Sequence, residues 1–431
     1  MSKPALLTSS GLHLRPDPAR TVIRPFDLAY PDAFRNDAHP RMEQIVDRVL
    51  SLDAASLADE HRAIIASLDE RHRDVEGLLK RRFEQVRAQV PQAESLSDEA
   101  RLVVAAYFSE EYSFEAAALF NPSMVARADQ TGTAPGEIRF FLSLRGIGEG
   151  HVSSVTFRTG TWSAANGFAI DNPSSQAVSP LIETCAKGEE TGVTHIVCEG
   201  SRDVSESVLF PVTPSQRQGI EDLRLVRFVE DDGSVHILGT YTAFDGRDAR
   251  SELLRATGFR NFAMTPLKGS AASAKGMALF PRRIDGRYFM LGRQDNESIW
   301  LLSSDDLYSW DGGAKLVSPR YPWEFVQMGN CGAPIEIDEG WLVLTHGVGM
   351  VRNYCMGACL LDKADPSKLL ARTVEPILRP SPQERDGYVP NVVYSCGAMV
   401  HDRTLLLPYG VADNFATFAS GSVDDLLQSM A

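Results

Sequence analysis

The hydrophobic residues in the first quarter of the chain follow a helical period. Between Arg41 and Ala105 there is one glycine, Gly77, and no proline from Pro40 to Pro91. Apolar side chains recur there at steps of three, four or seven, the spacing of one face of an α-helix: Leu57, Ile64, Leu68, Val75, Leu79, Phe83, Val86 and Val90. The pattern predicts one long amphipathic helix over 57–90.

A second helix is predicted directly after this one. Ser95 and Ser97 precede Asp98 and Glu99, an arrangement typical of a helix N-terminus. The apolar face of a helix as long as 57–90 needs a cover, supplied either by the rest of the chain or by a second subunit. Because so long a rod extends beyond what one domain covers, we expect a homo-oligomer that pairs through these N-terminal helices.

After about residue 119 the pattern changes to short β-type runs. These runs are four to seven residues long, and Gly, Asp, Asn or Pro separates them. A helical pattern returns only at Val423–Met430. The second part of the chain is therefore expected to consist of strands.

A repeat organises these strands into five units, each with a first strand, a turn and a second strand that ends on a polar residue. The units begin at Asn121, Glu221, Lys275, Gly332 and Gly397, and their second strands are expected at 140–145, 235–241, 288–293, 341–346 and 405–413. The starts are separated by 100, 54, 57 and 65 residues, so the first interval is expected to contain an insertion at about 147–214.

Repeats of this length made of short strands are typical of a β-propeller. The sequence predicts an all-β, five-bladed β-propeller over 119–431, preceded by an α-helical extension over 1–118. A two-sheet β-sandwich with coincidental hairpins is the alternative, and the five similar phrases count against it.

Composition and charge narrow the possible functions. The 431 residues are 43% hydrophobic and 23% charged, which is ordinary for a globular protein, and the formal net charge is −14. This acidic balance argues against nucleic-acid and membrane-surface binding. No apolar run reaches the roughly 18 to 20 residues of a membrane-spanning helix. Six cysteines in so long a chain do not indicate a disulfide framework, so a cytoplasmic location is expected.

Polar residues at equivalent repeat positions are the candidate functional residues, because a propeller brings equivalent loops to one axial funnel. They are Asn121, Arg145, Glu221, Asp222, Arg224, Lys275, Arg293, His346 and Asp413. Arginine and lysine bind phosphate or carboxylate groups, whereas carboxylates bind sugar hydroxyls and act as acids. Each residue alone is weak support, and the set gains weight through the repeat.

The phrases that contain these residues resemble glycoside hydrolase family 130, the β-mannoside phosphorylases and related β-mannosidases. The resemblance covers about residues 120–419. It is carried by Gly219-Ile-Glu-Asp-Leu-Arg224, Lys275-Gly-Met-Ala-Leu-Phe-Pro281, Gly332-Ala-Pro-Ile335, His346-Gly-Val348, Gly387-Tyr-Val-Pro-Asn-Val-Val393 and Tyr409-Gly-Val-Ala-Asp413. The family fold is a five-bladed propeller, in agreement with the five repeats.

The resemblance implies inverting phosphorolysis of β-mannosides, with Asp222 as general acid. The acid protonates the glycosidic oxygen through a sugar hydroxyl while inorganic phosphate attacks the anomeric carbon and α-mannose 1-phosphate leaves. Matches to the family's phosphate-binding residues are Lys275, Arg293, His346 and Tyr354. Matches to mannoside-binding residues are Asn121, Arg145, Glu221, Arg224 and Asp413, and His151 in the insertion is a candidate for the acceptor end.

Two other functions remain open. Hydrolysis of β-mannosides needs a second carboxylate to activate water, which Glu149 could supply from the insertion. A non-catalytic carbohydrate-binding propeller would not need the acid. No resident cofactor is expected, with phosphate as co-substrate, and no metal, because Cys355 and Cys359 lack histidine partners at zinc spacing. The expected partners are thus a manno-oligosaccharide and phosphate.

Overall fold

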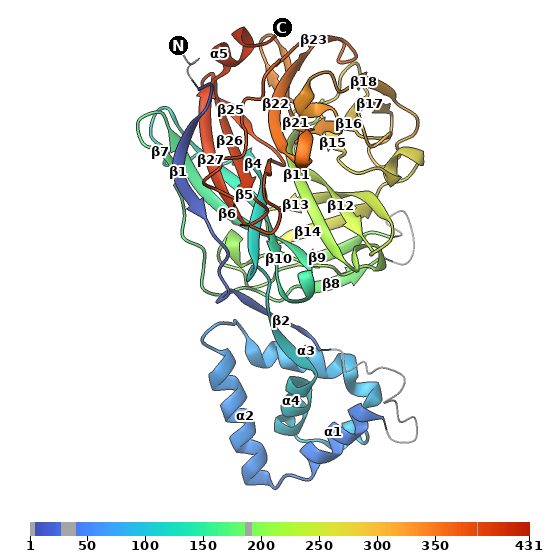
Figure 1. Cartoon of the computed structure of the whole chain (residues 1–431). Coiled ribbons are helices and arrows are strands. Elements are labelled where there is room, and N and C mark those ends of the chain that lie inside the picture. Colours follow the sequence, from blue (N-terminus) through green and yellow to red (C-terminus); the bar gives the residue numbers. More distant parts are fainter. Residues whose placement is uncertain (1–4, 27–39, 186–191, 386) are drawn as a thin grey trace. The chain divides into compact units, whose positions relative to one another are not determined.

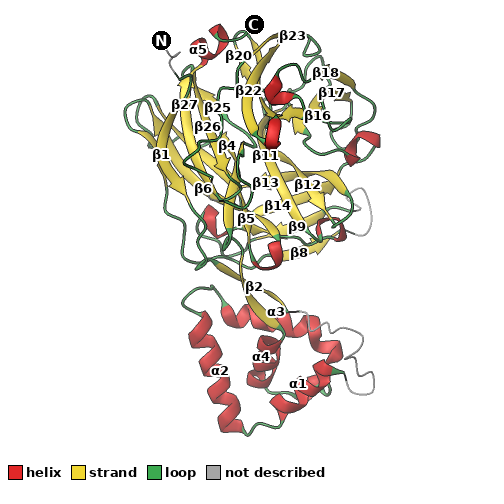
Figure 2. Ribbon diagram, in the orientation of Figure 1, coloured by secondary structure: helices red, strands yellow, loops and turns green. Residues whose placement is uncertain are grey.

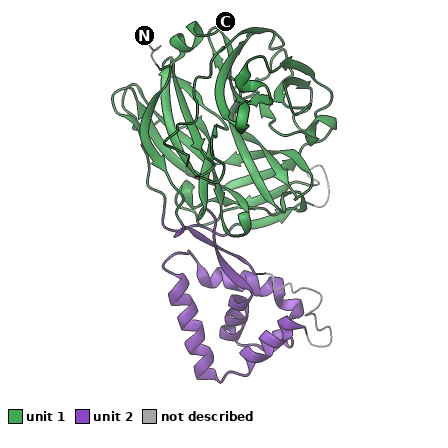
Figure 3. Cartoon of the chain, in the orientation of Figure 1, with its two compact units in different colours: residues 1–17, 115–173, 180–431 green, residues 18–114, 174–179 purple. Residues whose placement is uncertain are grey.

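The computed structural model describes residues 5–26, 40–185, 192–385 and 387–431, and these residues form two compact units (Figures 1 and 3). Unit 1 comprises the described residues within 1–17, 115–173 and 180–431, and unit 2 comprises those within 18–114 and 174–179. Unit 1 consists mostly of strands, whereas the longer helices belong to unit 2 (Figure 2).

Unit 2 is a small helical unit with one two-stranded sheet. Its elements are α1 (Arg41–Leu50), α2 (Ala54–Leu68), α3 (Val75–Val86), α4 (Asp98–Tyr107), β2 (Thr21–Pro25) and β3 (Ser109–Ser113). The predicted second helix is confirmed as α4, where the Ser97 hydroxyl accepts a hydrogen bond from the Ala100 N–H at 3.2 Å.

The prediction of one helix over 57–90 is wrong, because the chain turns between α2 and α3. His72 is buried in this turn, with Nε2 2.7 Å from Glu111 Oε1 on β3. Asp74 follows with a left-handed φ of 51° and caps α3 by accepting from the Gly77 N–H at 3.2 Å. The hydrogen bond of a buried side chain and a new cap therefore outweigh the continuity of the apolar pattern.

The apolar stripe is buried inside unit 2 itself. Its members from Leu68 to Val90 form one core with residues of α1 and α4: Leu68, Val75, Leu79, Phe83, Val86 and Val90 pack with Val46, Val49, Leu102, Val103 and Phe108. Because α2 and α3 are two shorter helices that pack in one core with α4, no single long helix presents an apolar face that needs cover. The reason for expecting a partner subunit at this stripe is thereby removed.

Four sheets make up unit 1. The first has the order β1 (Thr8–Leu14), β27 (Phe415–Ser422), β26 (Thr404–Val411) and β24 (Val393–Tyr394), and β25 (Met399–His401) also pairs with β26. The second has four strands, β15 (Ala278–Leu279), β16 (Tyr288–Gly292), β17 (Ile299–Ser304) and β18 (Ala314–Val317). The third contains β19 (Gln327–Asn330), β21 (Gly340–Val348), β22 (Tyr354–Leu361) and β23 (Leu369–Arg372), with β20 (Ile335–Ile337) beside β21.

The fourth sheet has eleven strands. Its first part contains β4 (Ala118–Ala126), β5 (Glu137–Ile147) and β6 (Ser153–Ser163), with β7 (Gly167–Ile170) and β10 (Val208–Leu209) beside β6. Its second part contains β11 (Gly219–Val229), β12 (Val235–Phe244), β13 (Ala249–Thr257), β14 (Asn261–Pro266), β9 (Thr194–Val197) and β8 (Leu181–Thr184). One residue pair, Gly219 with Ser153, joins β11 to β6, so the two parts are nearly separate.

All five predicted strand pairs occur as antiparallel pairs. They are β4 with β5, β11 with β12, β15 with β16, β20 with β21 and β25 with β26. The C-terminal helical pattern is present as α5 (Val423–Gln428). The segment expected as an insertion contributes β6 to β10, all of which lie in the eleven-stranded sheet.

The N-terminal strand β1 departs from the expected helical extension. It pairs with β27 near the C-terminus, with Leu14 opposite Ala416, and therefore belongs to unit 1. Among the described residues, no helix has the length and apolarity that crossing a membrane requires.

Candidate active site

Two equivalent bulges place the first pair of candidate residues. The ladder of β4 skips between Phe120 and Ser123, and that of β11 skips between Glu221 and Arg224. Asn121 and Asp222 lie in these bulges with φ of 47° and 55°. Asn and Asp tolerate this left-handed region better than most residues, and a bulge redirects a side chain out of the sheet. As a result, Asn121 Nδ2 donates to Asp222 Oδ1 at 2.8 Å.

The other carboxylate of this phrase, Glu221, lies between two cations. Arg145 Nη2 donates to Glu221 Oε1 at 3.0 Å, and Lys275 Nζ donates to Oε2 at 3.2 Å. Arg145 also places Nη1 3.6 Å from Asp222 Oδ1, while its Nε donates to Ser153 Oγ at 2.7 Å. The structure thus brings five predicted residues into one connected network, which we call the acid cluster: Asn121, Arg145, Glu221, Asp222 and Lys275.

Arg224 fixes the backbone of the second bulge. Its Nη1 donates to the main-chain oxygen of Asp222 at 2.8 Å, and its Nε donates to the Cys331 carbonyl at 3.1 Å. Its Nη2 donates to the Tyr394 hydroxyl at 2.9 Å. The side chain is only 3% exposed, so Arg224 supports the backbone of Asp222 from inside the fold and offers little surface to a ligand.

Tyr394 is a site residue that the sequence analysis missed. Its hydroxyl accepts the hydrogen bond from Arg224, and its ring centroid lies 5.0 Å from that of His346. Its position one residue after the phrase 387–393 was the only available signal. Through this tyrosine, Arg224 and the second group of predicted residues are connected.

That second group, which we call the phosphate cluster, contains Arg293, His346 and Tyr354. Arg293 Nη1 lies 3.3 Å from His346 Nε2, and the His346 ring stacks on Tyr354 with centroids 6.1 Å apart and planes at 13°. Gly329 on the neighbouring strand makes room for the imidazole, since a β-carbon there would lie 2.6 Å from His346 Cε1. Lys275, predicted to belong here, instead has its ion pair in the acid cluster.

The protonation state of His346 follows from its surroundings. Burial and the neighbouring Arg293 and Arg224 guanidiniums hold its pKa well below the ordinary value, so the ring is neutral. A guanidinium only donates hydrogen bonds, so Nε2 accepts from Arg293 and the ring proton is on Nδ1. Arg293 Nε is buried and has no hydrogen-bond partner among the described residues. The phosphate cluster therefore has donor capacity left for a ligand.

The two carboxylates near the bulges titrate differently. Burial acts to raise the pKa of Asp222, but Arg224, Arg145, the Asn121 hydrogen bond and Lys275 outweigh it and lower this pKa. Asp222 is therefore ionised in this arrangement.

Asp413 shows the opposite shift. It lies in the turn between β26 and β27 with φ of 50°. Burial, followed by repulsion from Asp222 and Glu221, raises the pKa of Asp413 to about 6, against the opposing effect of Arg145 and Arg352. Asp413 therefore interacts electrostatically with the acid cluster.

His151 lies outside both clusters. It is exposed on the short turn Glu149–His151 after β5, and its ring is 5.8 Å from that of Tyr388, which is 76% exposed. Within the described ranges, no hydrogen bond or ion pair joins His151 or Glu149 to Asp222.

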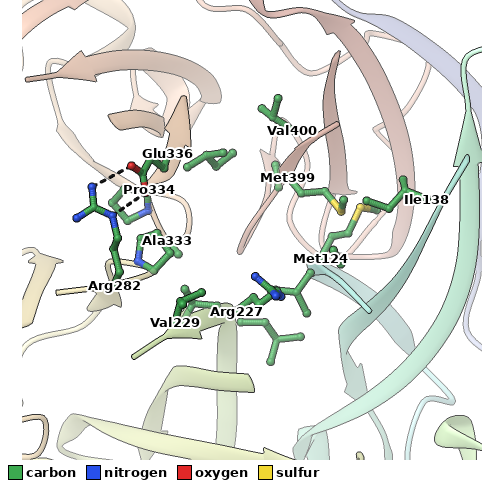
Figure 4. Close-up of a pocket in the computed structure, with 17 residues that line it drawn as sticks. Met124, Ile138, Arg227, Val229, Arg282, Ala333, Pro334, Glu336, Met399 and Val400 are labelled. Carbon is green, nitrogen blue, oxygen red and sulfur yellow. Dashed lines mark hydrogen bonds and ion pairs between the residues drawn. The ribbon is translucent and has the colours of Figure 1, made fainter. Parts of the chain in front are cut away.

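A separate cavity of about 330 Å³ is lined by residues farther along the strands that carry the bulges (Figure 4). Met124 and Ile138 line one side, and Arg282 forms a two-point ion pair with Glu336 on the other, at 2.8 and 2.9 Å. Arg227, which also lines it, is five residues from Asp222 along β11, about 16 Å at 3.3 Å per residue. None of the predicted site residues lines this cavity; those that interact with one another do so in the acid cluster and the phosphate cluster.

No group of three or more His, Cys, Asp or Glu within the described part of the chain is arranged to hold a metal ion. The functional groups available are carboxylates, guanidiniums, an amine, an imidazole and phenols. These groups suit acid catalysis beside an anion rather than metal ligation.

Comparisons with known proteins agree with this chemistry. A family model described as Glyco_hydro_130, "beta-1,4-mannooligosaccharide phosphorylase", matches residues 200–431. A 1,2-β-oligomannan phosphorylase of Thermoanaerobacter sp. is 35% identical over 227 residues, which is 52% of this chain and 75% of the relative.

Solved structures share the fold. That of the β-1,2-mannobiose phosphorylase of Listeria innocua, in complex with β-1,2-mannobiose, superimposes with a TM-score of 0.53 at 22% identity. The match covers 74% of this chain and 92% of that one. A second structure, from a study of family members that are glycoside hydrolases targeting β-1,2-mannosidic linkages, has a TM-score of 0.51 at 19% identity, over 72% and 86% of the two chains. At these identities the likeness concerns the fold alone.

Proposed function

The chain belongs to glycoside hydrolase family 130, and from this premise we propose that it is an inverting β-mannoside phosphorylase that releases α-mannose 1-phosphate. The observation that carries the proposal is the pairing of the carboxyl group of Asp222, surrounded by the acid cluster, with a separate group of cationic and neutral donors around Arg293. Phosphate is already a nucleophile, so a site of this kind needs an acid and an anion-binding group but no base.

The proposed architecture is a five-bladed propeller. It is supported by the five antiparallel strand pairs and by the single residue pair that joins the two parts of the eleven-stranded sheet. In this arrangement β1 would complete the last blade beside β27, and residues 119–431 would supply the remaining strands. The bulges of β4 and β11 would then occupy equivalent positions in the first two blades.

In the proposed reaction, a phosphate oxygen attacks the anomeric carbon of the mannosyl unit from the face opposite the leaving sugar. The carbon–oxygen bond to that sugar breaks, and its oxygen takes a proton from Asp222 through a sugar hydroxyl. The configuration at the anomeric carbon inverts, giving α-mannose 1-phosphate and a mannoside shortened by one unit. Asp413, with Asn121 and Arg145, is proposed to hold the mannosyl hydroxyls.

Phosphate binding would also favour protonation of Asp222. The cations that lower the pKa of Asp222 would be neutralised in part by a bound anion, and burial would then raise this pKa. Asp222 would accordingly take up a proton most readily when the nucleophile is bound. The acid and the anion site are thus expected to be electrostatically coupled.

Hydrolysis is the second candidate, and one observation favours it. Asp413 is a carboxylate coupled to Asp222 whose pKa is raised to about 6, as suits a general base. Glu149, the base considered from the sequence, is exposed, and among the described residues no hydrogen bond or ion pair joins it to the acid cluster. Inverting hydrolases place acid and base roughly 6.5 to 9.5 Å apart, with a water between them.

The products distinguish the two candidates. The protein is incubated with β-1,2- and β-1,4-mannobiose, with and without phosphate, and mannose 1-phosphate and free mannose are quantified. We expect one mannose 1-phosphate per bond cleaved, and no cleavage without phosphate. Two free mannose molecules per bond, formed equally fast without phosphate, would establish hydrolysis. No cleavage with Asp222→Asn, beside normal cleavage with Asp248→Asn on an exposed loop, would assign the activity to this site.

Two further expectations remain proposals. A cytoplasmic location is supported by the six cysteines, all of which are free thiols. A homo-oligomer through the N-terminal helices would have to use the outer surface of unit 2, where Leu50, Leu52 and Tyr107 are exposed, because the apolar stripe is buried. Light scattering on the full chain and on a Leu50→Glu, Leu52→Glu variant tests it, and an unchanged mass would exclude this surface.

A further inference from the structure

Two loops far apart in the sequence have the same backbone conformation. Residues 148–152 connect β5 to β6, and residues 349–353 connect β21 to β22. The glycines that open them have nearly equal dihedrals, φ −113° and ψ −160° for Gly148 and φ −107° and ψ −157° for Gly349. Each glycine N–H donates to the carbonyl of the last loop residue, at 3.3 Å in the first loop and 2.9 Å in the second. The two loops are therefore structural equivalents.

Each loop has two consecutive residues with positive φ, Gly150 and His151 in the first and Val351 and Arg352 in the second, and the loops differ at the first of the two. In the first loop this residue is Gly150, with φ of 68°, for which the conformation is unstrained. In the second it is Val351, with φ of 55° and ψ of 34°. A β-branched residue is a genuine outlier in this region, and such strain persists only where the surrounding structure imposes it. Since Val351 is 88% exposed, packing of its own side chain does not explain the conformation.

The strained turn presents the next residue, Arg352, beside the phosphate cluster. Its guanidinium carbon lies 5.8 Å from the ring centroid of Tyr354, the ring that stacks on His346. Arg352 also acts electrostatically on Asp413. Its side chain makes no hydrogen bond or ion pair within the described part of the chain. Arg352 is thus a cation at the edge of the candidate site that has neither a hydrogen bond nor an ion pair among the described residues.

The charges of the connected groups support a role for this cation. The connected groups include three carboxylates, namely Asp222, Glu221 and Asp413. They also include four cations, namely Arg145, Arg224, Lys275 and Arg293. His346 is neutral, so these groups alone have one excess positive charge. With Arg352 the excess is two. Phosphate carries between about one and two negative charges near neutral pH, so an additional cation at the edge of this positively charged site would strengthen its attraction for phosphate.

We propose that Arg352 is a further phosphate-binding residue, held by the strained loop at the solvent side of the phosphate cluster. This inference rests on the proposed phosphorolysis. Arg293 would bind the anion from the buried side and Arg352 from the exposed side. The equivalent loop 148–152 has histidine at the matching position, so the cation is specific to the loop beside Tyr354.

The test measures Michaelis constants for phosphate and for β-1,2-mannobiose in the wild type, Arg352→Ala and Arg352→Lys. Arg352→Ala is expected to raise the KM for phosphate about tenfold while the KM for mannobiose changes less than twofold, because one charge-assisted contact is lost. Arg352→Lys should restore part of the affinity. The matched control is Arg247→Ala, on the loop between β12 and β13, where Arg247 lies near Asp245; its constants should equal those of the wild type.

The outcomes are separable. A wild type that requires phosphate, with an unchanged phosphate KM in Arg352→Ala, overturns the inference and leaves the proposed function intact. A larger rise in the KM for mannobiose than in the KM for phosphate also overturns it, because Arg352 would then contact the sugar. An equal rise in the phosphate KM of Arg247→Ala overturns it as well, because the effect would then come from the general loss of positive charge. A wild type that cleaves mannobiose without phosphate overturns the proposed function and this inference together.

Discussion

The acid cluster and the phosphate cluster differ in how their charged groups are paired. In the acid cluster, Asp222 and Glu221 are held by Asn121, Arg145 and Lys275 at 2.8 to 3.2 Å. In the phosphate cluster, Arg293 keeps a buried Nε without a partner, and its one described contact is to a neutral histidine. The carboxylates of the acid cluster are thus paired with cations of the chain itself, although Asn121 Oδ1 is buried without a partner among the described residues, whereas Arg293 is left with donor capacity for an anion. We expect substitutions in the acid cluster to affect the chemical step and substitutions in the phosphate cluster to affect phosphate binding.

The largest effect is expected from Asp222→Asn. Asparagine retains the size of the side chain and can still bond Asn121, but it has no acidic proton to give. We expect kcat to fall by roughly 10²-fold or more, the typical contribution of a general acid. The fold should be retained with a lower melting temperature, because the cations that lower the pKa of Asp222 lose their anion. Steady-state assays and thermal melts measure both, with Asp248→Asn as control. A variant within a few-fold of wild-type activity would remove Asp222 from the mechanism.

Arg293→Ala tests the second half of the comparison. Losing a charge-assisted contact costs roughly 1.5 to 3 kcal/mol, so the KM for phosphate should rise about ten- to 150-fold. The KM for the mannoside should change far less. Exposed Arg287, which pairs with Asp305 at 3.0 Å, provides a matched control as Arg287→Ala. Equal increases in the KM values for phosphate and for the mannoside would mean that Arg293 does not serve phosphate binding specifically, contrary to the proposed roles of the two clusters.

Tyr394→Phe tests the link between the halves. The substitution removes the hydroxyl that accepts from Arg224 Nη2 and leaves a buried guanidinium donor without a partner. We expect a loss of about 1 to 3 kcal/mol in the free energy of unfolding and a fall in kcat of about tenfold, because Arg224 holds the backbone of Asp222. Tyr308→Phe, outside both clusters, is the control. Wild-type kcat in a destabilised Tyr394→Phe protein would show that the hydroxyl supports the fold only.

The smallest effect concerns Asp413 and pH. Its folded-state pKa is raised from 3.8 to about 6, so the folded protein binds the proton more tightly than the unfolded chain does. The stability that this proton provides is complete below about pH 4 and is lost as the pH rises through 6. Asp413→Asn should therefore be more stable than the wild type at pH 8, by about 3 kcal/mol. Melting curves from pH 4 to 8 measure this, and a gain that is the same at every pH would contradict the raised pKa.

Local sequence patterns predicted the elements of the fold well where neighbouring residues decide the outcome. The short β-type runs predicted the five antiparallel strand pairs. The repeat aligned Asn121 with Glu221, whereas the two bulges make Asp222 the structural equivalent of Asn121 and bring these two side chains into contact. The bulges themselves were not predicted, because nothing in the local sequence distinguishes a skipped ladder position from a regular one.

Long-range contacts account for what the sequence did not show. The helix over 57–90 breaks because His72 bonds Glu111, 39 residues away, while the apolar spacing continues across the turn. Tyr394 joins the site through Arg224, 170 residues away. Arg352 lies on a loop whose likeness to 148–152 exists in the backbone dihedrals and not in the residues.

The most direct test of the central claim is the anomeric configuration of the product, followed by proton NMR while the protein cleaves β-1,2-mannobiose in phosphate buffer. The proposal predicts α-mannose 1-phosphate as the first product to appear, with one free mannose released for each molecule formed. Free mannose as the first product from both halves of the disaccharide, at a rate independent of phosphate, would contradict it.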